Sequence, residues 1–156
     1  LPIGSEATST RAVIIYGVSV EAPWDYSRFT VELAEYNIEK QDISGNCLRF
    51  NRTEANISAL PGEIKYFAFD APAGYYVYSP FNGAGLLGNF YAFEAPAGKN
   101  VYVGDFILKK DRLVTLNRDF DKVKSQMAAA LPALSKEIAL SKVTVVRAPH
   151  PFLCAP

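Results

Sequence analysis

Two cysteines, Cys47 and Cys154, and a single histidine, His150, are the residues from which nucleophilic chemistry would have to be built. A nearby histidine can activate a cysteine, so Cys47 and His150 predict one alternative function, a cysteine-dependent hydrolase. The competing interpretation is a disulfide between Cys47 and Cys154, which would consume that nucleophile and fasten the C-terminal segment to the body of the protein. We favour the disulfide, and with it an oxidising compartment; two separate buried thiols are the third alternative.

The sequence gives little support to a metal or cofactor site. One histidine and no Cys-x-x-Cys pair argue against zinc, and no Asp-x-Asp-x-Asp-Gly loop is present for calcium. The stretch NGAGLLGN, residues 82–89, matches Gly-x-Gly-x-x-Gly in letters, but it precedes strand-forming residues rather than a helix. We therefore expect no cofactor, no metal and no bound nucleotide.

One segment occurs twice with few changes, as YFAFDAPAGYYVY at residues 66–78 and as FYAFEAPAGKNVY at residues 90–102. In each copy Pro-Ala-Gly suits a tight turn, because proline presets φ and glycine accepts a left-handed conformation. The turn residues are Pro72, Gly74, Pro96 and Gly98. The duplication therefore predicts two successive β-hairpins with three-residue loops.

The expected hairpin register sorts the side chains of the repeat onto two faces. The apolar face would hold Phe67, Phe69, Val77, Tyr91, Phe93, Val101 and Val103. The other face would carry tyrosines and acids that could stack on sugar rings or on a partner protein, with Trp24 and Tyr26 as possible additions. The candidate ligand-binding residues on it are Tyr66, Asp70, Tyr76, Tyr78, Glu94 and Tyr102.

The composition limits the partners of the protein. Sixteen Lys and Arg residues balance sixteen Asp and Glu residues, which argues against nucleic acid. No apolar run approaches the roughly 20 residues of a membrane-spanning helix, so we expect no transmembrane segment. Residues 1–11 are interpreted as a flexible leader, without the basic and apolar regions of a signal peptide.

The hydrophobic pattern predicts short strands followed by one late helix. Apolar or alternating strands are expected at residues 12–20, 28–36, 47–50, 101–110, 113–116 and 143–146, beside the two hairpins. The helix is expected at about residues 118–131, capped by Asn117 or Asp119, with Phe120, Val123, Met127 and Leu131 on one face. Residues 51–63 and 79–89 are predicted to be loops, residues 132–140 a second short helix, and residues 147–156 an extended tail.

These elements predict one mainly β domain over residues 12–156. The fold class we expect is an antiparallel β-sandwich, immunoglobulin-like or prealbumin-like, with the C-terminal helix packed on it.

The segments LPGEIKYFAFDAPAGYYVY (60–78) and FYAFEAPAGKNVYVGDF (90–106) resemble small β-sandwich domains of bacterial exported proteins and lipoproteins, over about residues 60–108. The resemblance implies an exported protein, periplasmic or anchored to the outer membrane by a lipid upstream of Leu1, and no enzymatic activity. The expected function is thus a structural or ligand-binding module of the cell envelope, whose partner is an envelope protein or a glycan. A carbohydrate-binding module using the tyrosine face is the first alternative, and the hydrolase is the second.

Overall fold

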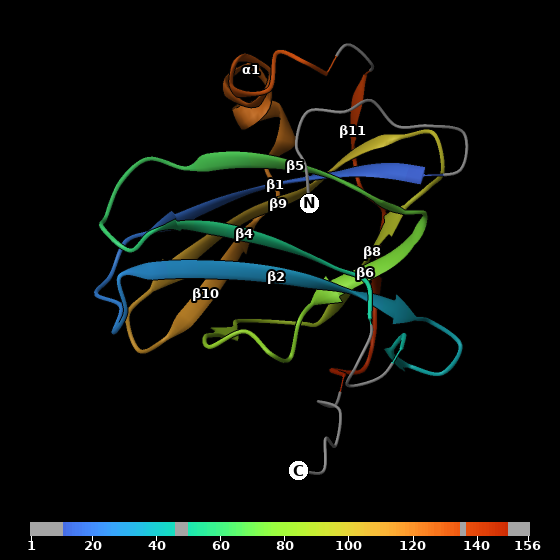
Figure 1. Ribbon diagram of the computed structural model, residues 1–156, viewed down its shortest axis with the longest axis horizontal. Helices are drawn as coiled ribbons and strands as arrows, with labels where there is room; N and C mark the ends of the chain where they lie inside the picture. The colour runs from blue at the N-terminus through green and yellow to red at the C-terminus, as the bar shows by residue number, and fades with distance from the viewer. Residues whose placement is uncertain (1–10, 46–49, 135–136, 150–156) are drawn as a thin grey trace.

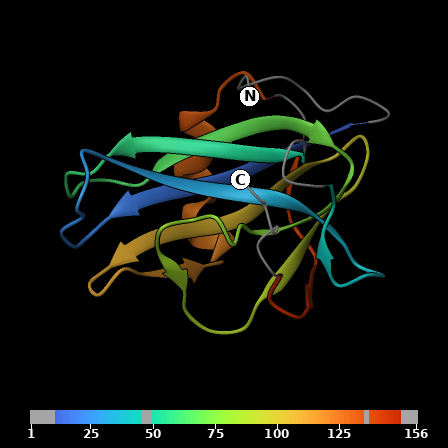
Figure 2. The same ribbon diagram turned by 60° about the horizontal axis from the view of Figure 1, so that its bottom comes forward.

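The computed structural model describes residues 11–45, 50–134 and 137–149, in which two β-sheets pack face to face. One α-helix covers the outer face of one sheet (Figure 1). The expected mainly β sandwich with a single helix is therefore confirmed. Figure 2 shows the same two layers from below, with the helix behind the sheet that it covers.

The first sheet, sheet A, has the strand order β5-β1-β9-β10-β7, with β11 beside β9. Its strands are β1 (Arg11–Val20), β5 (Lys65–Pro72), β7 (Gly85–Leu86), β9 (Asn100–Lys109), β10 (Leu113–Asn117) and β11 (Ile138–Leu140). Strand β1 is buried on both faces, as its run of β-branched and other apolar residues indicates. It pairs antiparallel with β5 but parallel with β9, so sheet A is mixed and the expectation of a purely antiparallel sandwich was wrong there, since strand patterns alone do not reveal strand direction.

The second sheet, sheet B, has the order β12-β8-β6-β2-β3, with β4 paired to β2. Its strands are β2 (Arg28–Asn37), β3 (Asp42–Ile43), β4 (Arg52–Ser58), β6 (Gly74–Tyr78), β8 (Tyr91–Ala95) and β12 (Val143–Val145). The prediction of a loop at residues 51–63 was wrong, because β4 alternates in burial with Thr53, Ala55 and Ile57 inward. The small and polar inward residues hide this period of two.

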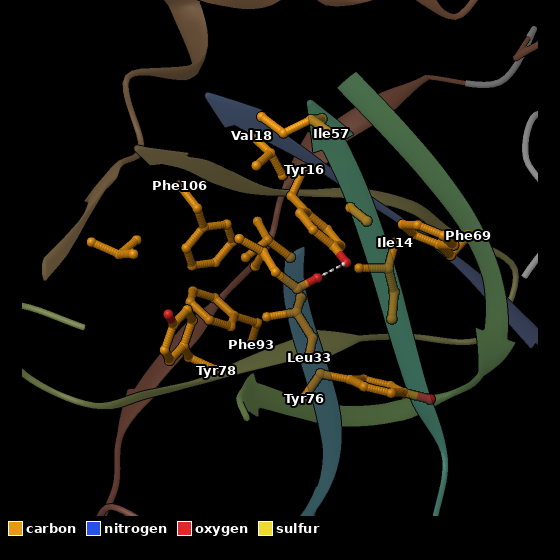
Figure 3. Close-up of a cluster of buried hydrophobic side chains, with 14 of the residues drawn as sticks. Ile14, Tyr16, Val18, Leu33, Ile57, Phe69, Tyr76, Tyr78, Phe93 and Phe106 are labelled. Atoms are coloured by element: carbon orange, nitrogen blue, oxygen red, sulfur yellow. Dashed lines mark hydrogen bonds between the residues drawn. The ribbon is translucent and has the colours of Figure 1, made fainter. Parts of the chain in front are cut away.

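The main core lies between the sheets and is rich in aromatic rings. Figure 3 shows Tyr16, Phe93 and Phe106 pointing toward one another from different strands. The Tyr16 and Phe106 rings meet edge to face at 5.6 Å. The Tyr16 hydroxyl donates to the Val31 carbonyl at 3.0 Å, so this fully buried polar group has a partner.

The duplicated segment does not form two hairpins, which corrects the expected register. In the first copy β5 belongs to sheet A and β6 to sheet B, and in the second β8 belongs to sheet B and β9 to sheet A. Each Pro-Ala-Gly is therefore a corner at which the chain changes sheets, once in each direction. Pro96 and Gly98 do lie at a tight turn, since Lys99 N–H donates to the Pro96 carbonyl at 3.2 Å. Pro72 ends β5, and Gly74 begins β6 after a bend.

The two copies also differ in which face of the sheet their last residues occupy. Tyr78 lies in the main core, whereas its counterpart Tyr102 lies on the outer face of sheet A. Conversely, Val101 enters the main core and Val77 lies on the outer face of sheet B. A shift of one residue after the corner reverses every later side chain, because strands have a period of two.

The helix α1 (Phe120–Ala130) confirms the expected element and its buried face. The Asp119 side chain accepts the Lys122 N–H at 3.4 Å as the N-cap. Met127 is fully buried against sheet A, and the Phe120 ring stacks on Tyr102 at 5.7 Å. The second helix expected at residues 132–140 was wrong, because Ile138–Leu140 pairs with β9 as β11.

Candidate functional site

The structure does not contain the expected tyrosine and acid platform. All four of its tyrosines are buried: Tyr66, Tyr76, Tyr78 and Tyr102. They also belong to different surfaces, because the chain changes sheets at each corner. Tyr76 and Tyr78 point into the main core, while Tyr66 and Tyr102 lie beneath α1. The expectation of one shared exposed face is therefore wrong.

The acids of that predicted face are likewise separated. Asp70 in β5 accepts from Arg11 Nε at 3.0 Å, and both side chains are partly exposed. Glu94 lies in β8 of sheet B, where its backbone N–H donates to the Lys142 carbonyl. These two carboxylates thus lie on different sheets and share no described contact with each other.

Tyr66 and Tyr102 have a structural partner in Asp105, which is fully buried in β9. The Tyr102 hydroxyl donates to Asp105 Oδ1 at 2.6 Å, and the Tyr66 hydroxyl donates to Oδ2 at 3.2 Å. Burial raises the pKa of Asp105 above its usual range, and the two hydroxyls partly oppose that rise. Because α1 covers this cluster, we interpret it as part of the packing beneath the helix.

An exposed pocket lies instead on the outer face of β2 and β4, and of its lining residues the sequence had pointed only to Trp24 and Tyr26. It encloses about 260 Å³. Polar side chains from the two strands form its floor, and aromatic rings from the loops border it. We call it the β2–β4 pocket, and its lining residues are Trp24, Tyr26, Arg28, Thr30, Glu32, Glu54, Phe81, Asn82 and Gly83.

Two carboxylates lie at the centre of the β2–β4 pocket. Glu32 and Glu54 are directly opposite each other in the antiparallel pair, an arrangement in which like charges repel. Arg52 Nε lies 3.4 Å from Glu32 and 2.8 Å from Glu54, so one guanidinium serves both. Ser79 Oγ donates to Glu32 at 2.5 Å. Burial, and then the charge of Glu54, raise the pKa of Glu32, while Ser79 and Arg52 oppose the rise.

Asn82 holds the loop that forms one wall of the pocket. Its side chain accepts the Glu32 backbone N–H at 2.9 Å and donates to the Glu32 carbonyl at 2.9 Å. These two bonds imitate the pairing of a neighbouring strand. Gly83 follows directly, and a Cβ there would lie 3.3 Å from the Trp24 ring, so the loop approaches that ring closely.

The aromatic border combines a fixed ring with exposed ones. Trp24 packs edge to face on Phe29 at 5.3 Å, and its Nε1 donates to the Arg28 carbonyl at 3.0 Å. Tyr26 lies 6.0 Å from Trp24 and is 67% exposed, while Phe81 is 43% exposed. Trp24 therefore both closes the end of the sandwich and supports the neighbouring exposed ring.

The remaining site predictions fall outside the described part of the chain. Cys47, His150 and Cys154 all lie there, as does most of the leader, so the disulfide and the hydrolase pair stay predictions. Within residues 11–45, 50–134 and 137–149, no group of three or more His, Cys, Asp or Glu side chains converges to hold a metal ion. In those same residues no helix is long and apolar enough to cross a membrane.

The geometry defines the class of protein as a β-sandwich with one covering helix and an exposed pocket of aromatic and carboxylate side chains. No protein family matches the chain, and no similar curated protein or solved structure was found. The signal for the pocket was the sequence TVE at residues 30–32 and TEAN at 53–56, which becomes informative only once β2 and β4 are paired.

Proposed function

We propose that the protein is a non-enzymatic binding module whose ligand is a neutral carbohydrate held in the β2–β4 pocket. The observation that carries the proposal is the arrangement of exposed rings beside paired carboxylates. The Tyr26 and Phe81 rings are both exposed, although Phe81 also contacts the Phe50 ring at 5.5 Å, and Glu32 and Glu54 lie on the floor between the loops that carry Tyr26 and Phe81. This site replaces the tyrosine face that the sequence suggested.

The residue types match what a sugar ring presents. The axial C–H groups of a pyranose form an apolar face that packs on an aromatic ring, and its hydroxyls donate well to carboxylates. Thr30 adds a hydroxyl and Asn56 an amide on the same strands, and these two side chains already contact each other. A hydroxyl-rich ligand could therefore exchange hydrogen bonds with several groups at once.

The charge balance favours a neutral ligand over an anion or a cation. The two carboxylates, Glu32 and Glu54, are matched by two guanidinium groups, those of Arg28 and Arg52, which lie in or beside the pocket. Neither sign is in excess, so electrostatic attraction to a phosphate or an amine would be weak. Hydrogen bonding and stacking are then the main sources of affinity.

The test is a glycan array followed by calorimetric titration of each sugar bound. We expect neutral oligosaccharides to bind, and Tyr26→Ala to weaken binding about tenfold, since truncating an anchoring aromatic residue commonly costs more than about 1 kcal/mol. Glu32→Gln should weaken it as well. Leu60→Ala is the matched control, because Leu60 is an exposed apolar residue that does not line the pocket.

Absence of any bound neutral glycan would reject the proposal. Binding that Tyr26→Ala and Glu32→Gln leave unchanged would place the ligand on another surface and would reject the β2–β4 pocket.

The proposal also places the module in a bacterial cell envelope, which rests on the resemblance of residues 60–108 and on the expected disulfide. A peptide map under non-reducing conditions tests the compartment. A bonded Cys47–Cys154 pair would support export into an oxidising space. Free thiols that alkylate rapidly would oppose it and would return attention to the hydrolase.

A further inference from the structure

A second cleft, separate from the β2–β4 pocket, lies at the edge of the sandwich where sheet A and sheet B part. It encloses about 320 Å³ and is lined mainly by apolar side chains from β7, β8, β10 and β12. Its apolar lining residues are Leu86, Leu87, Tyr91, Leu116 and Val143. We call it the edge cleft.

The edge cleft joins exposed apolar residues to the main core. Leu86, Tyr91 and Leu116 pack against the core residues between the sheets. At the mouth, Leu87 is 48% and Val143 37% exposed. Large apolar side chains exposed together at a concave site are a frequent sign of a ligand.

One cation, Arg118, lines the cleft beside these apolar side chains, and Asn89 is its other polar side chain. The Arg118 side chain is half-buried; its Nε donates to the Val103 carbonyl at 2.8 Å, and its Nη2 donates to Ser141 Oγ at 3.0 Å and to the Ser141 carbonyl. The guanidinium also lies 5.6 Å from the centre of the Phe93 ring. These contacts fix the group in place between the two sheets.

The charge of Arg118 has no counterion in the described part of the chain. No carboxylate there lies within ion-pair distance of it, and the Nη1 atom has no protein acceptor among the same residues. Desolvation lowers the pKa of Arg118, which reflects the cost of removing the charge from water. An anion bound at Nη1 would offset that cost.

We propose that the edge cleft binds a medium-chain fatty acid, with its carboxylate on Arg118 and its alkyl chain against Leu86, Leu87 and Val143. A single fixed guanidinium suits a single carboxylate, because Nε and Nη2 of Arg118 already donate to the protein and the two N–H groups of Nη1 are left to donate to one ligand group. The apolar side chains of Leu86, Leu87 and Val143 offer contacts to an alkyl chain. The volume lies near the lower limit for ligand pockets, which favours a short chain.

The test uses sodium octanoate below its micellar concentration, followed by amide chemical shifts and by calorimetry. We expect saturable binding, with shift changes at residues 86–88 and 143. Octanol has the same chain without the carboxylate, so it should bind about tenfold more weakly or worse. Arg118→Gln should reduce octanoate affinity by about the same factor, and Arg11→Gln, which removes a guanidinium elsewhere, should not.

Because Arg118→Gln could weaken the fold, a second pair of variants tests the same charge effect at an exposed position. Both Leu87→Glu and Leu87→Lys remove an apolar wall residue, but only Leu87→Glu places a negative charge at the mouth, so it should reduce octanoate affinity more than Leu87→Lys does. The inference is overturned if octanoate produces no shift changes, if octanol binds equally well, or if Leu87→Glu and Leu87→Lys bind octanoate alike. It does not depend on the β2–β4 pocket.

Discussion

Tyr102 donates a 2.6 Å hydrogen bond to Asp105, and both side chains are completely buried beneath α1. The shortness of this bond is typical of a hydroxyl that donates to a charged oxygen. Replacing Tyr102 with Phe removes this donor and leaves Oδ1 of the buried Asp105 without the hydrogen bond from Tyr102. We expect the free energy of unfolding to fall by about 1–3 kcal/mol, measured by urea denaturation.

Tyr26→Phe is the control, because it removes a tyrosine hydroxyl at an exposed position. This substitution should change the free energy of unfolding by less than about 0.5 kcal/mol. Equal stability of Tyr102→Phe and the wild type would show that the Tyr102–Asp105 bond contributes nothing measurable to folding.

The sequence predicted the elements better than it predicted their partners. Strand β1 and helix α1 were recognisable because each has a clear apolar pattern that one element can satisfy alone. The corner residues Pro96 and Gly98 were also recognised as a turn, yet local turn chemistry does not say whether the chain returns to its own sheet or enters another. In this protein β5 and β9 both pair with β1 in sheet A, while β6 and β8 pair with each other in sheet B, so neither expected hairpin forms.

The candidate site failed for the same physical reason. The predicted tyrosine face assumed one register, but a shift of one residue between the copies sent Tyr78 inward and Tyr102 beneath α1. The β2–β4 pocket needs three distant segments: β2, β4 and the loop that carries Asn82. The spacing of residues within any one of these segments does not show that the three segments come together in the fold.

The pair Glu32 and Glu54 predicts how stability depends on pH. The pKa of Glu32 is raised in the folded protein, so the folded state holds this proton more tightly than the unfolded state does. The free energy of unfolding should therefore fall as pH rises from the ordinary glutamate range through the raised pKa. Glu54→Gln removes the opposing charge, so we expect a shallower decline, while the loss of the Arg52–Glu54 ion pair lowers stability at every pH above the ordinary glutamate range.

The measurement is urea denaturation of the wild type and Glu54→Gln at a series of pH values. Asp105 also has a raised pKa and contributes a decline of the same sign, but it contributes to both proteins and cancels in the difference. Glu63→Gln, at an exposed position outside the β2–β4 pocket, should follow the wild type. Parallel curves for wild type and Glu54→Gln would show that the two glutamates are not coupled.

Gly98 is the corner residue whose backbone most restricts substitution. Its φ is +78°, in the left-handed region, and its N–H donates to the Arg11 carbonyl at 2.8 Å. A β-branched residue there is strained, so Gly98→Val should lower the free energy of unfolding by about 1–3 kcal/mol. Gly62→Val is the matched control, because Gly62 is exposed and the nearest atom to a Cβ there is 3.9 Å away. Equal thermal unfolding of the two variants would contradict the corner geometry.

Asn82 connects the fold to the β2–β4 pocket, because its side chain is bonded to both backbone groups of Glu32. Asn82→Ala removes both bonds, and we expect a loss of about 1–3 kcal/mol in the free energy of unfolding. The Glu32 amide should then exchange its hydrogen faster in D₂O, because its acceptor is gone. Asn82→Asp keeps the acceptor but loses the donor to the Glu32 carbonyl, so its Glu32 amide should stay more protected than in Asn82→Ala. Asn89→Ala changes an exposed residue of the same connection and is the control, so the exchange rate of the Glu32 amide should stay as in the wild type. Equal exchange of the Glu32 amide in Asn82→Ala, Asn82→Asp and Asn89→Ala would mean that Asn82 does not hold the loop against β2.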